Sequence, residues 1–101
     1  MILTDKCLEA FGVYILKTHK IASWECFENL PKLLQNALII EFFDSVNITV
    51  DVMPILNNPI KWQPNTLCLE KEICTEEIEY FDTRSEATEK AIEKANEIFN
   101  N

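Results

Sequence analysis

Paired carboxylates are the residues of this sequence whose type and spacing could do chemistry. Glu70 and Glu72 are two positions apart, as are Glu77 and Glu79, so on a strand each pair would share one face. Two such carboxylates can act as a general acid and base or bind Mg²⁺. Nothing in the flanking sequence indicates a site that would exclude water, and a solvated strand face gives the same pattern. We therefore predict no catalytic residues and a protein that is not an enzyme.

The other residues that often carry chemistry are one histidine and four cysteines. His19 follows an amphipathic segment and has no potential metal ligand near it in the sequence. The cysteines lack the paired spacing of a zinc site and lie within or beside apolar stretches, so we expect reduced thiols that pack as small hydrophobic groups. They are Cys7, Cys26, Cys68 and Cys74. With a single glycine, Gly12, a glycine-rich phosphate loop is impossible, so the sequence predicts no metal and no cofactor.

Length and charge set the general class of protein. A chain of 101 residues predicts a single domain, 1–101. Seventeen acidic and nine basic residues give a net charge of −8, which disfavours direct binding to nucleic acid and would attract a basic groove on another protein. No apolar run approaches the ~20 residues of a membrane span, and the start of the chain does not resemble a signal peptide. We expect a cytoplasmic protein that does not bind membranes and is a monomer or small homo-oligomer.

Hydrophobic periodicity predicts three helices. The first covers about residues 5–18, is capped by Thr4, and contains Gly12, which would permit close approach of another element. The second begins with Pro31 at its first position and is apolar over most of its circumference, so it should be the central helix. The last covers 83–99 and begins with a capping box of Thr83 and Glu86. Its apolar stripe must be covered by the rest of the chain.

Between the second and the last helix, apolar and polar residues alternate, which indicates strands. Alternating residues predict strands at 48–52, 60–62, 66–74 and 77–81, with turns at 57–59 and 64–65. The order helix, helix, three or four strands, helix predicts an α+β domain. Its antiparallel sheet should carry the helices on one face.

The opposite face of this sheet is predicted to be acidic. Alternation places Thr49 and five carboxylates there, and gathering like charges is unfavourable unless a partner uses them. The predicted partner-binding carboxylates are Asp51, Glu70, Glu72, Glu77 and Glu79. Trp24, in a connector over 21–29, and Trp62 are added as aromatic candidates, because exposed aromatic residues are common at interfaces. For Trp24 the alternative is a lid over the core.

Three segments resemble a known group of proteins. They are 27–31 (Phe-Glu-Asn-Leu-Pro), 40–46 (Ile-Glu-Phe-Phe-Asp-Ser-Val) and the last helix, over 83–87 and 90–100. Together they cover about half of the chain, which resembles short, acidic, mostly uncharacterised proteins of phages and prophages of Bacteroidetes bacteria. Such proteins often have Gly after the Asp-Ser-Val, where this chain has Asn47.

The resemblance implies a function in inhibition. Small acidic phage proteins of this kind resemble anti-CRISPR inhibitors, and the type VI-B effector, an RNA-guided ribonuclease, is common in Bacteroidetes hosts. The implied partner is a basic groove of such an effector, which the protein would occupy by mimicking nucleic acid and so interfere with guide or target RNA. Two alternatives remain: a phage accessory module that binds another host or virion protein, and a metal-dependent hydrolase that uses the paired acids.

The thiols give the first testable prediction. If the cysteines are reduced and unpaired, titration under denaturing, non-reducing conditions should find four reactive groups. A result of two or none would contradict the prediction of a reduced cytosolic protein.

Overall fold

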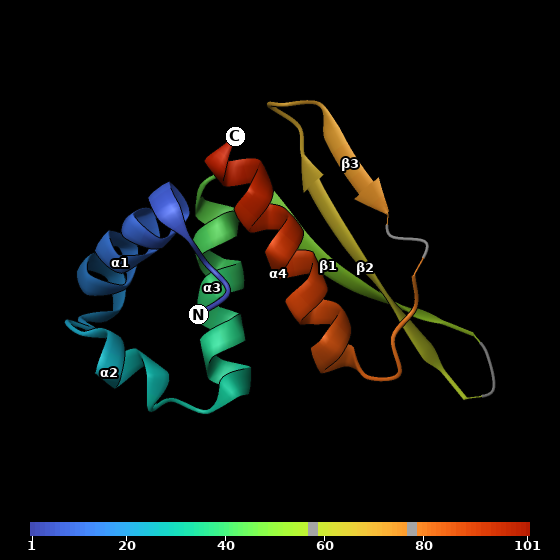
Figure 1. Ribbon diagram of the computed structural model, residues 1–101, viewed down its shortest axis with the longest axis horizontal. Coiled ribbons are helices and arrows are strands. Elements are labelled where there is room, and N and C mark those ends of the chain that lie inside the picture. The colour runs from blue at the N-terminus through green and yellow to red at the C-terminus, as the bar shows by residue number, and fades with distance from the viewer. Residues whose placement is uncertain (57–58, 77–78) are drawn as a thin grey trace.

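The computed structural model describes residues 1–56, 59–76 and 79–101, with only the backbone described at 75 and 76. In chain order the elements are α1 (Asp5–His19), α2 (Trp24–Glu28), α3 (Lys32–Ser45), β1 (Ile48–Ile55), β2 (Lys61–Cys68), β3 (Ile73–Glu76) and α4 (Arg84–Asn100). Figure 1 shows α1 and α2 at one side of the molecule and the sheet at the other, with α3 and α4 between them. The predicted α+β class is confirmed.

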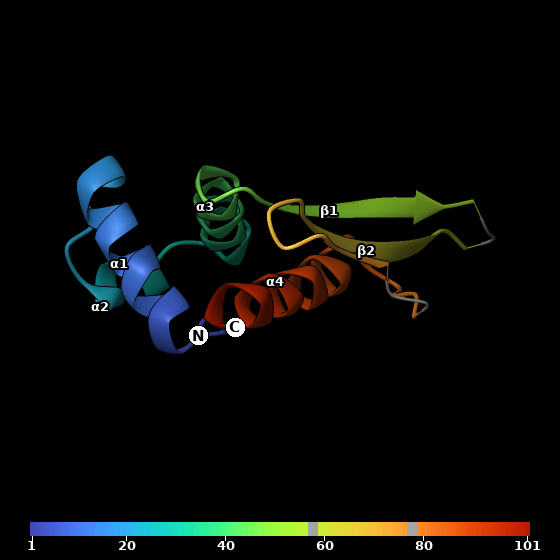
Figure 2. The same cartoon turned by 90° about the horizontal axis from the view of Figure 1, so that it is seen from above.

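The helices and the sheet form layers in a thin molecule of 43 × 31 × 18 Å. α4 packs on β1 and β2, α3 packs on β1 and α4, and α1 packs on α3 and α4 (Figure 2). Along β1, Ile48 and Val50 are buried while Thr49 and Asp51 are exposed. One face of the sheet therefore carries the helices and the other faces solvent, as the alternation predicted.

The sheet has the order β1-β2-β3 and is antiparallel throughout. β1 and β2 pair along all eight residues, from Ile48 opposite Cys68 to Ile55 opposite Lys61. β3 pairs only with the last four residues of β2. Further along the same side of β2, Phe81 and Trp62 exchange two backbone hydrogen bonds of 2.9 Å. Both β1 and β3 are therefore edge strands.

Two prolines lie inside strands, where their missing N–H groups leave no gap in the ladder. Pro64 was predicted in a turn over 64–65, but it is buried within β2. Residues two apart in a strand direct their backbone N–H groups to the same side. Trp62 bonds to Phe81 on the β3 side of β2, so the nitrogen of Pro64 also faces the β3 side. It lies beyond the part of β2 that pairs with β3. Pro54 pairs with Trp62, so its nitrogen faces the open edge of β1, a position that tolerates proline.

The segment 66–74 was predicted as one strand and is instead a hairpin. Glu72 donates its N–H to the carbonyl of Leu69 at 3.1 Å and has φ 55°, so the chain reverses over 69–72. Cys68 is consequently buried while Cys74 is exposed, although a single strand over 66–74 would place both on one face. The prediction was wrong because Leu69, 76% exposed, continues the apolar alternation through the turn.

The predicted last strand, 77–81, is reduced to one bridge in the part that the structure describes. Residues 77 and 78, which include Glu77, lie outside the described residues. Glu79 and Tyr80 have no strand conformation, and Phe81 alone pairs with Trp62.

α4 begins at the predicted cap, and a cation from the β2–β3 turn bonds to its C-terminal end. Thr83 Oγ1 accepts a hydrogen bond from the N–H of Glu86 at 3.1 Å and donates to the carboxylate of Glu86 at 3.0 Å. The carboxylate thus bonds the hydroxyl of Thr83 and not the backbone N–H of Thr83, which is its partner in a capping box. At the other end, Lys71 Nζ donates to the carbonyls of Ile98 at 2.5 Å and Asn101 at 2.9 Å. A cation there satisfies unpaired carbonyls and complements the helix dipole.

The last helix also caps the first. Thr4 occupies the predicted N-cap position of α1, but its side chain makes no capping bond. Instead Asn100 Oδ1 accepts from the N–H of Cys7 at 2.9 Å. Asn96 accepts from the N–H of Thr4 and donates to Thr4 Oγ1, each at 3.0 Å. Residues more than 90 positions apart therefore join α1 to α4.

The connector predicted over 21–29 contains the short helix α2. Ser23 Oγ accepts from the N–H of Cys26 at 3.2 Å and caps this helix. α2 places Trp24 against α1 at Gly12, where a Cβ atom would lie 3.1 Å from Cζ2 of the indole. The close approach predicted for Gly12 is confirmed.

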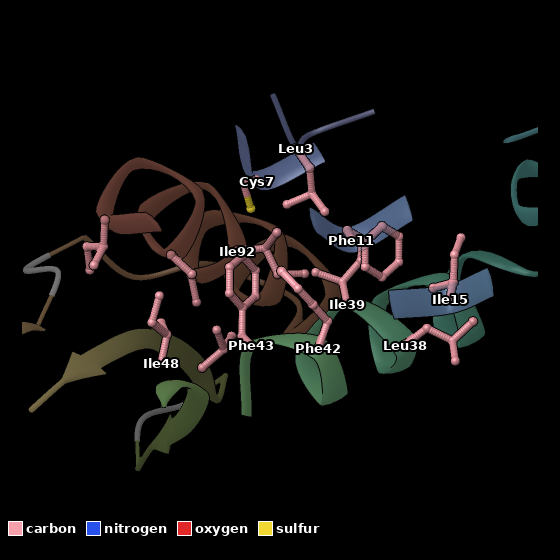
Figure 3. Packing of buried hydrophobic residues seen from close by; sticks show 14 of the residues in the cluster. Leu3, Cys7, Phe11, Ile15, Leu38, Ile39, Phe42, Phe43, Ile48 and Ile92 are labelled. Carbon is pink, nitrogen blue, oxygen red and sulfur yellow. The ribbon is translucent and has the colours of Figure 1, made fainter. Parts of the chain in front are cut away.

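α3 is the central helix, as predicted. The ring of its Phe42 lies 5.5 Å from that of Phe11 on α1 and 5.8 Å from that of Phe99 on α4, centroid to centroid. Figure 3 shows the side chains of α3 between Phe11 and Ile92 of α4. The buried cluster continues from there to Ile48 on the sheet.

The N-terminal half of α3 leaves part of its apolar surface uncovered. Leu33 is 84% exposed, and Leu34 and Ala37 are exposed as well, although the helix was predicted to be apolar over most of its circumference and central. Ile39 is buried. Pro31 is the N-cap residue, one position before its predicted place.

The role of α4 in the core gives a stability prediction. Ile92 is 0% exposed, so Ile92→Ala should lower the free energy of unfolding by about 2–4 kcal/mol through lost burial and a cavity. Glu93→Ala, at the neighbouring exposed position, should change it by no more than about 0.5 kcal/mol. Urea denaturation measures both, and equal effects would contradict the packing of α4.

Candidate functional site

The predicted acidic set is divided among several parts of the fold. Asp51 lies on the uncovered face of β1, Glu70 and Glu72 lie in the β2–β3 turn, and Glu79 lies between β3 and α4. Glu77 is outside the described residues. The prediction that Glu70 and Glu72 lie on a strand face is therefore wrong in its placement, because the chain reverses at that point. Their role in binding stays a prediction.

Asp51 has a structural contact at the edge of the sheet. Its carboxylate accepts a hydrogen bond of 2.8 Å from the N–H of Val52. Val52 pairs with Pro64, whose nitrogen faces away from β1, so the N–H of Val52 also points away from β2, to the open edge. Open edge donors invite pairing with other chains. Asp51 thus covers one such donor, and Pro54 removes the next.

Glu70 and Glu72 stand at the tip of the second hairpin. Asn47, with φ 63°, donates its side-chain N–H to Glu70 at 3.1 Å. Lys71 lies between the two carboxylates in sequence, but its ammonium is bonded to the C-terminal carbonyls of α4. Both glutamates are exposed, so this turn presents two carboxylates to solvent.

The two tryptophans are far apart in the fold. Trp24, 38% exposed, stacks on Phe11 with ring centroids 6.2 Å apart and covers Gly12. These contacts fit the alternative of a lid over the core. Trp62 is half-buried in β2, and the guanidinium of Arg84 lies 4.5 Å from its ring centroid. Figure 1 places α2 and β2 on opposite sides of the molecule, so the tryptophans do not form one surface.

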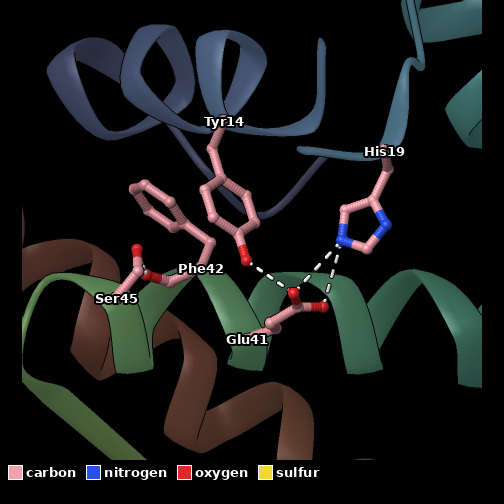
Figure 4. A network of polar contacts seen from close by, with 5 residues as sticks. All are labelled: Tyr14, His19, Glu41, Phe42 and Ser45. Carbon is pink, nitrogen blue, oxygen red and sulfur yellow. Dashed lines mark hydrogen bonds and ion pairs between the residues drawn. The ribbon is translucent and has the colours of Figure 1, made fainter. Parts of the chain in front are cut away.

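A polar cluster that the sequence did not indicate joins α1 to α3. Tyr14 donates its hydroxyl proton to Glu41 Oε1 at 2.7 Å, and His19 Nε2 lies 3.1 Å from Glu41 Oε2 (Figure 4). The hydrogen bond to Glu41 raises the pKa of Tyr14 to about 12. The bond from Tyr14, followed by the one from His19, lowers the pKa of Glu41. His19 and Glu41 are 22 positions apart, so no local motif could have revealed the pair.

The cluster clamps α1 on α3. Tyr14 and His19 of α1 both contact the carboxylate of Glu41 on α3. The pKa of Tyr14 moves up and that of Glu41 moves down, both away from neutrality. Among the described side chains, no group of three His, Cys, Asp or Glu is placed to hold a metal ion.

The cysteines are free thiols in two environments. Cys7 and Cys68 are buried, whereas Cys26 and Cys74 are exposed. Burial raises the pKa of the Cys7 thiol to about 12, which keeps it protonated and unreactive. The expectation that the cysteines are unpaired is confirmed. The expectation that all four pack as hydrophobic groups is wrong for Cys26 and Cys74, which are exposed.

An apolar groove lies between α3 and α4. It has a volume of about 470 Å³, within the range of ligand pockets. Its lining residues are Lys32, Leu33, Asn36, Ala37, Ile40, Arg84, Ser85 and Thr88. Sequence reasoning missed it because the apolar residues of α3 were all assigned to the core. The available signal was that α3 has more apolar positions than a helix of one core needs.

The Tyr14–Glu41 bond predicts a raised tyrosine titration. In a Tyr80→Phe protein Tyr14 is the only tyrosine, and its absorbance near 295 nm should titrate with a midpoint at about pH 12. Adding Glu41→Gln should move the midpoint towards 10, its ordinary value. Because the pKa is higher in the folded protein, the contribution to stability is complete below about pH 10 and is lost as the pH rises through 12. A midpoint near 10 in both proteins would contradict the bond.

Comparison with known proteins gives no relative from which function could be transferred. No protein-family model matches the chain, and neither a curated protein nor a solved structure matches it. None of the helices in the described ranges is long and apolar enough to cross a membrane.

Proposed function

We propose that this chain is a non-enzymatic binding protein that docks on a basic groove of a host protein. The target class implied by its resemblance to small acidic phage proteins is an RNA-guided CRISPR effector, with the type VI-B ribonuclease as the first candidate. In that role the protein inhibits the effector by competing with guide or target RNA for a basic channel.

The observation that carries this proposal is the excess of acidic side chains on the surface. The chain has seventeen acidic and nine basic residues. Every described acidic side chain is exposed except that of Glu89, which is half-buried. Several basic groups already have partners within the fold: Lys32 pairs with Glu89, Lys61 with Asp82, and Lys71 with the end of α4. Such a surface attracts a basic groove and repels phosphate.

Within that surface, the β2–β3 turn is the first contact we assign. Glu70 and Glu72 are exposed two positions apart at a hairpin tip, where a groove can receive them. Asp51 lies about 10 Å along the strands from the start of this turn, because it pairs with Asn65, three residues before Cys68, and a strand rises about 3.3 Å per residue. Both positions fit within one protein interface of ordinary size.

Charge reversal tests the assignment. Glu70→Lys with Glu72→Lys should keep the fold, because turn positions on the surface tolerate charge, and should weaken effector binding by about tenfold or more. The readouts are association rate by surface plasmon resonance at low and physiological salt, and cleavage of a reporter RNA by the effector. For the unmodified protein, association should slow as salt rises.

The matched control carries the same change of charge at the other side of the molecule. Glu25→Lys with Glu28→Lys on α2 should reduce binding much less, with circular dichroism confirming that both variants fold. Equal losses in the two variants would exclude the turn as the contact. If the unmodified protein binds no RNA-guided effector, the inhibitor proposal fails and another host or virion protein becomes the target. Cleavage of RNA by the protein alone with Mg²⁺ would favour the hydrolase.

A further inference from the structure

We infer that the groove between α3 and α4 binds a small amphipathic carboxylate of the acylated amino acid type, with an apolar chain, an amide N–H and a carboxylate at one end. The groove is separate from the β2–β3 turn, so the inference does not depend on the proposed function. It rests on the basic side chains at the start of the groove, on the apolar side chains beyond them, and on a buried polar atom without a partner.

The charges that line the groove select an anion. Among the described residues, its only charged lining side chains are Lys32 and Arg84. Arg84 has no carboxylate partner in the described part of the chain, and its contact with the ring of Trp62 is not a hydrogen bond, so its N–H groups are available. Lys32 Nζ lies 3.4 Å from the carboxylate of Glu89 at the surface, and an ammonium group has donors for a second carboxylate.

The starts of two helices add to this positive charge. α3 begins at Lys32 and α4 begins at Arg84, and the N-terminus of a helix carries a partial positive charge. The N-cap residue of α3, Pro31, makes no side-chain capping bond, so N–H groups of the first turn can bond to an anion. At the other end, Asp44 is exposed one turn beyond Ile40 and disfavours a carboxylate there. The carboxylate of the ligand therefore lies at the start of the two helices.

The apolar chain of the ligand has a place beyond the cations. Leu33, Ala37 and Ile40 are at positions i, i+4 and i+7 of α3 and line the groove over about 10 Å, at a rise of 1.5 Å per residue. Leu33, at 84% exposure, has almost no packing within this fold. Ser85 and Thr88 line the facing wall with short side chains, which leaves room for a ligand. A chain lying here buries apolar surface that the fold leaves in water.

Asn36 adds the requirement for a hydrogen-bond donor. Its side chain lines the groove and is 5% exposed, and its Oδ1 has no hydrogen-bond partner among the described residues. An unpaired buried acceptor is unfavourable, and a carboxylate has no proton to donate to it. An acylated amino acid carries an amide N–H next to its carboxylate. Lys32 and Asn36 are one turn apart, about 6 Å along α3, so such a ligand reaches both.

The probe for this site is N-octanoylglycine, added to the full chain and followed by NMR. It should bind with a Kd on the order of 1 mM or tighter, as expected of a ligand of this size. The shifted backbone amide signals should be those of α3 between Lys32 and Ile40 and of α4 between Arg84 and Thr88. No binding at about 10 mM, or shifts confined to the sheet, would overturn the inference.

Two analogues of the probe separate its polar contacts. The methyl ester of N-octanoylglycine has no charge and should bind at least about fivefold more weakly. N-octanoylsarcosine keeps the carboxylate but has a methyl group in place of the amide hydrogen, and should bind at least about threefold more weakly. Equal binding of the acid and its ester would exclude a carboxylate site.

Charge removal in the protein tests the same contact from the other side. Arg84→Gln should weaken binding of N-octanoylglycine about fivefold or more and leave its methyl ester within about twofold, because only the acid uses the cation. The matched control Lys17→Gln removes a cation on α1, outside the groove, and should leave both ligands within about twofold. If Arg84→Gln weakened the acid and the ester equally, Arg84 would act on the shape of the groove and the assignment would be wrong.

Two further variants test the donor contact and the occupant. Asn36→Leu should bind N-octanoylglycine and N-octanoylsarcosine alike, with a melting temperature that stays the same or rises. A preference for the glycine compound that persists in this variant would contradict the role of Asn36. If sedimentation shows a dimer that Leu33→Ser dissociates, the occupant is a second copy of the chain and the small-molecule assignment is wrong.

Discussion

The packing of Phe42 is the contact on which the arrangement of the helices depends. Its ring lies within 5.3–5.8 Å of four others, those of Phe11 and Tyr14 on α1, Phe43 on α3 and Phe99 on α4. Because α1 packs mainly on α3 and α4 and not on the sheet, these rings join the N-terminal layer to the rest. The hydrogen bonds of Asn96 and Asn100 to the start of α1 then fix its position along α4.

α3 packs against α1 and against α4 and β1, and part of its surface is covered by none of them. Phe42 contacts Phe11 on α1 and Phe99 on α4, Phe43 belongs to the same buried cluster as Ile48 of the sheet, and Leu33, Ala37 and Ile40 line the groove. Exposed apolar residues grouped in this way are typical of interaction sites. The acidic turn and this groove are two different kinds of surface, the first suited to attraction at a distance and the second to tight contact.

Local sequence patterns determined the class of the fold and most helix boundaries. Caps and hydrophobic periods act over three or four residues, so the start of α4 at Thr83 and the extent of α1 could be predicted from sequence. The same locality explains the errors among the strands. Pro64 resembled a turn residue, and Leu69 resembled a strand residue, because their environments depend on the neighbouring strands rather than on adjacent residues.

Composition alone determined that the protein is acidic, but only the tertiary structure decided where its distinctive surfaces lie. The turn over 69–72 moved Glu70 and Glu72 from a sheet face to a hairpin tip, and the packing of α1 on α3 brought His19 to Glu41. The groove exists because α3 and α4, separated by the whole sheet in sequence, lie side by side with Asn36 between them. Such contacts depend on how elements pack in three dimensions, which the local periodicity of a sequence does not encode.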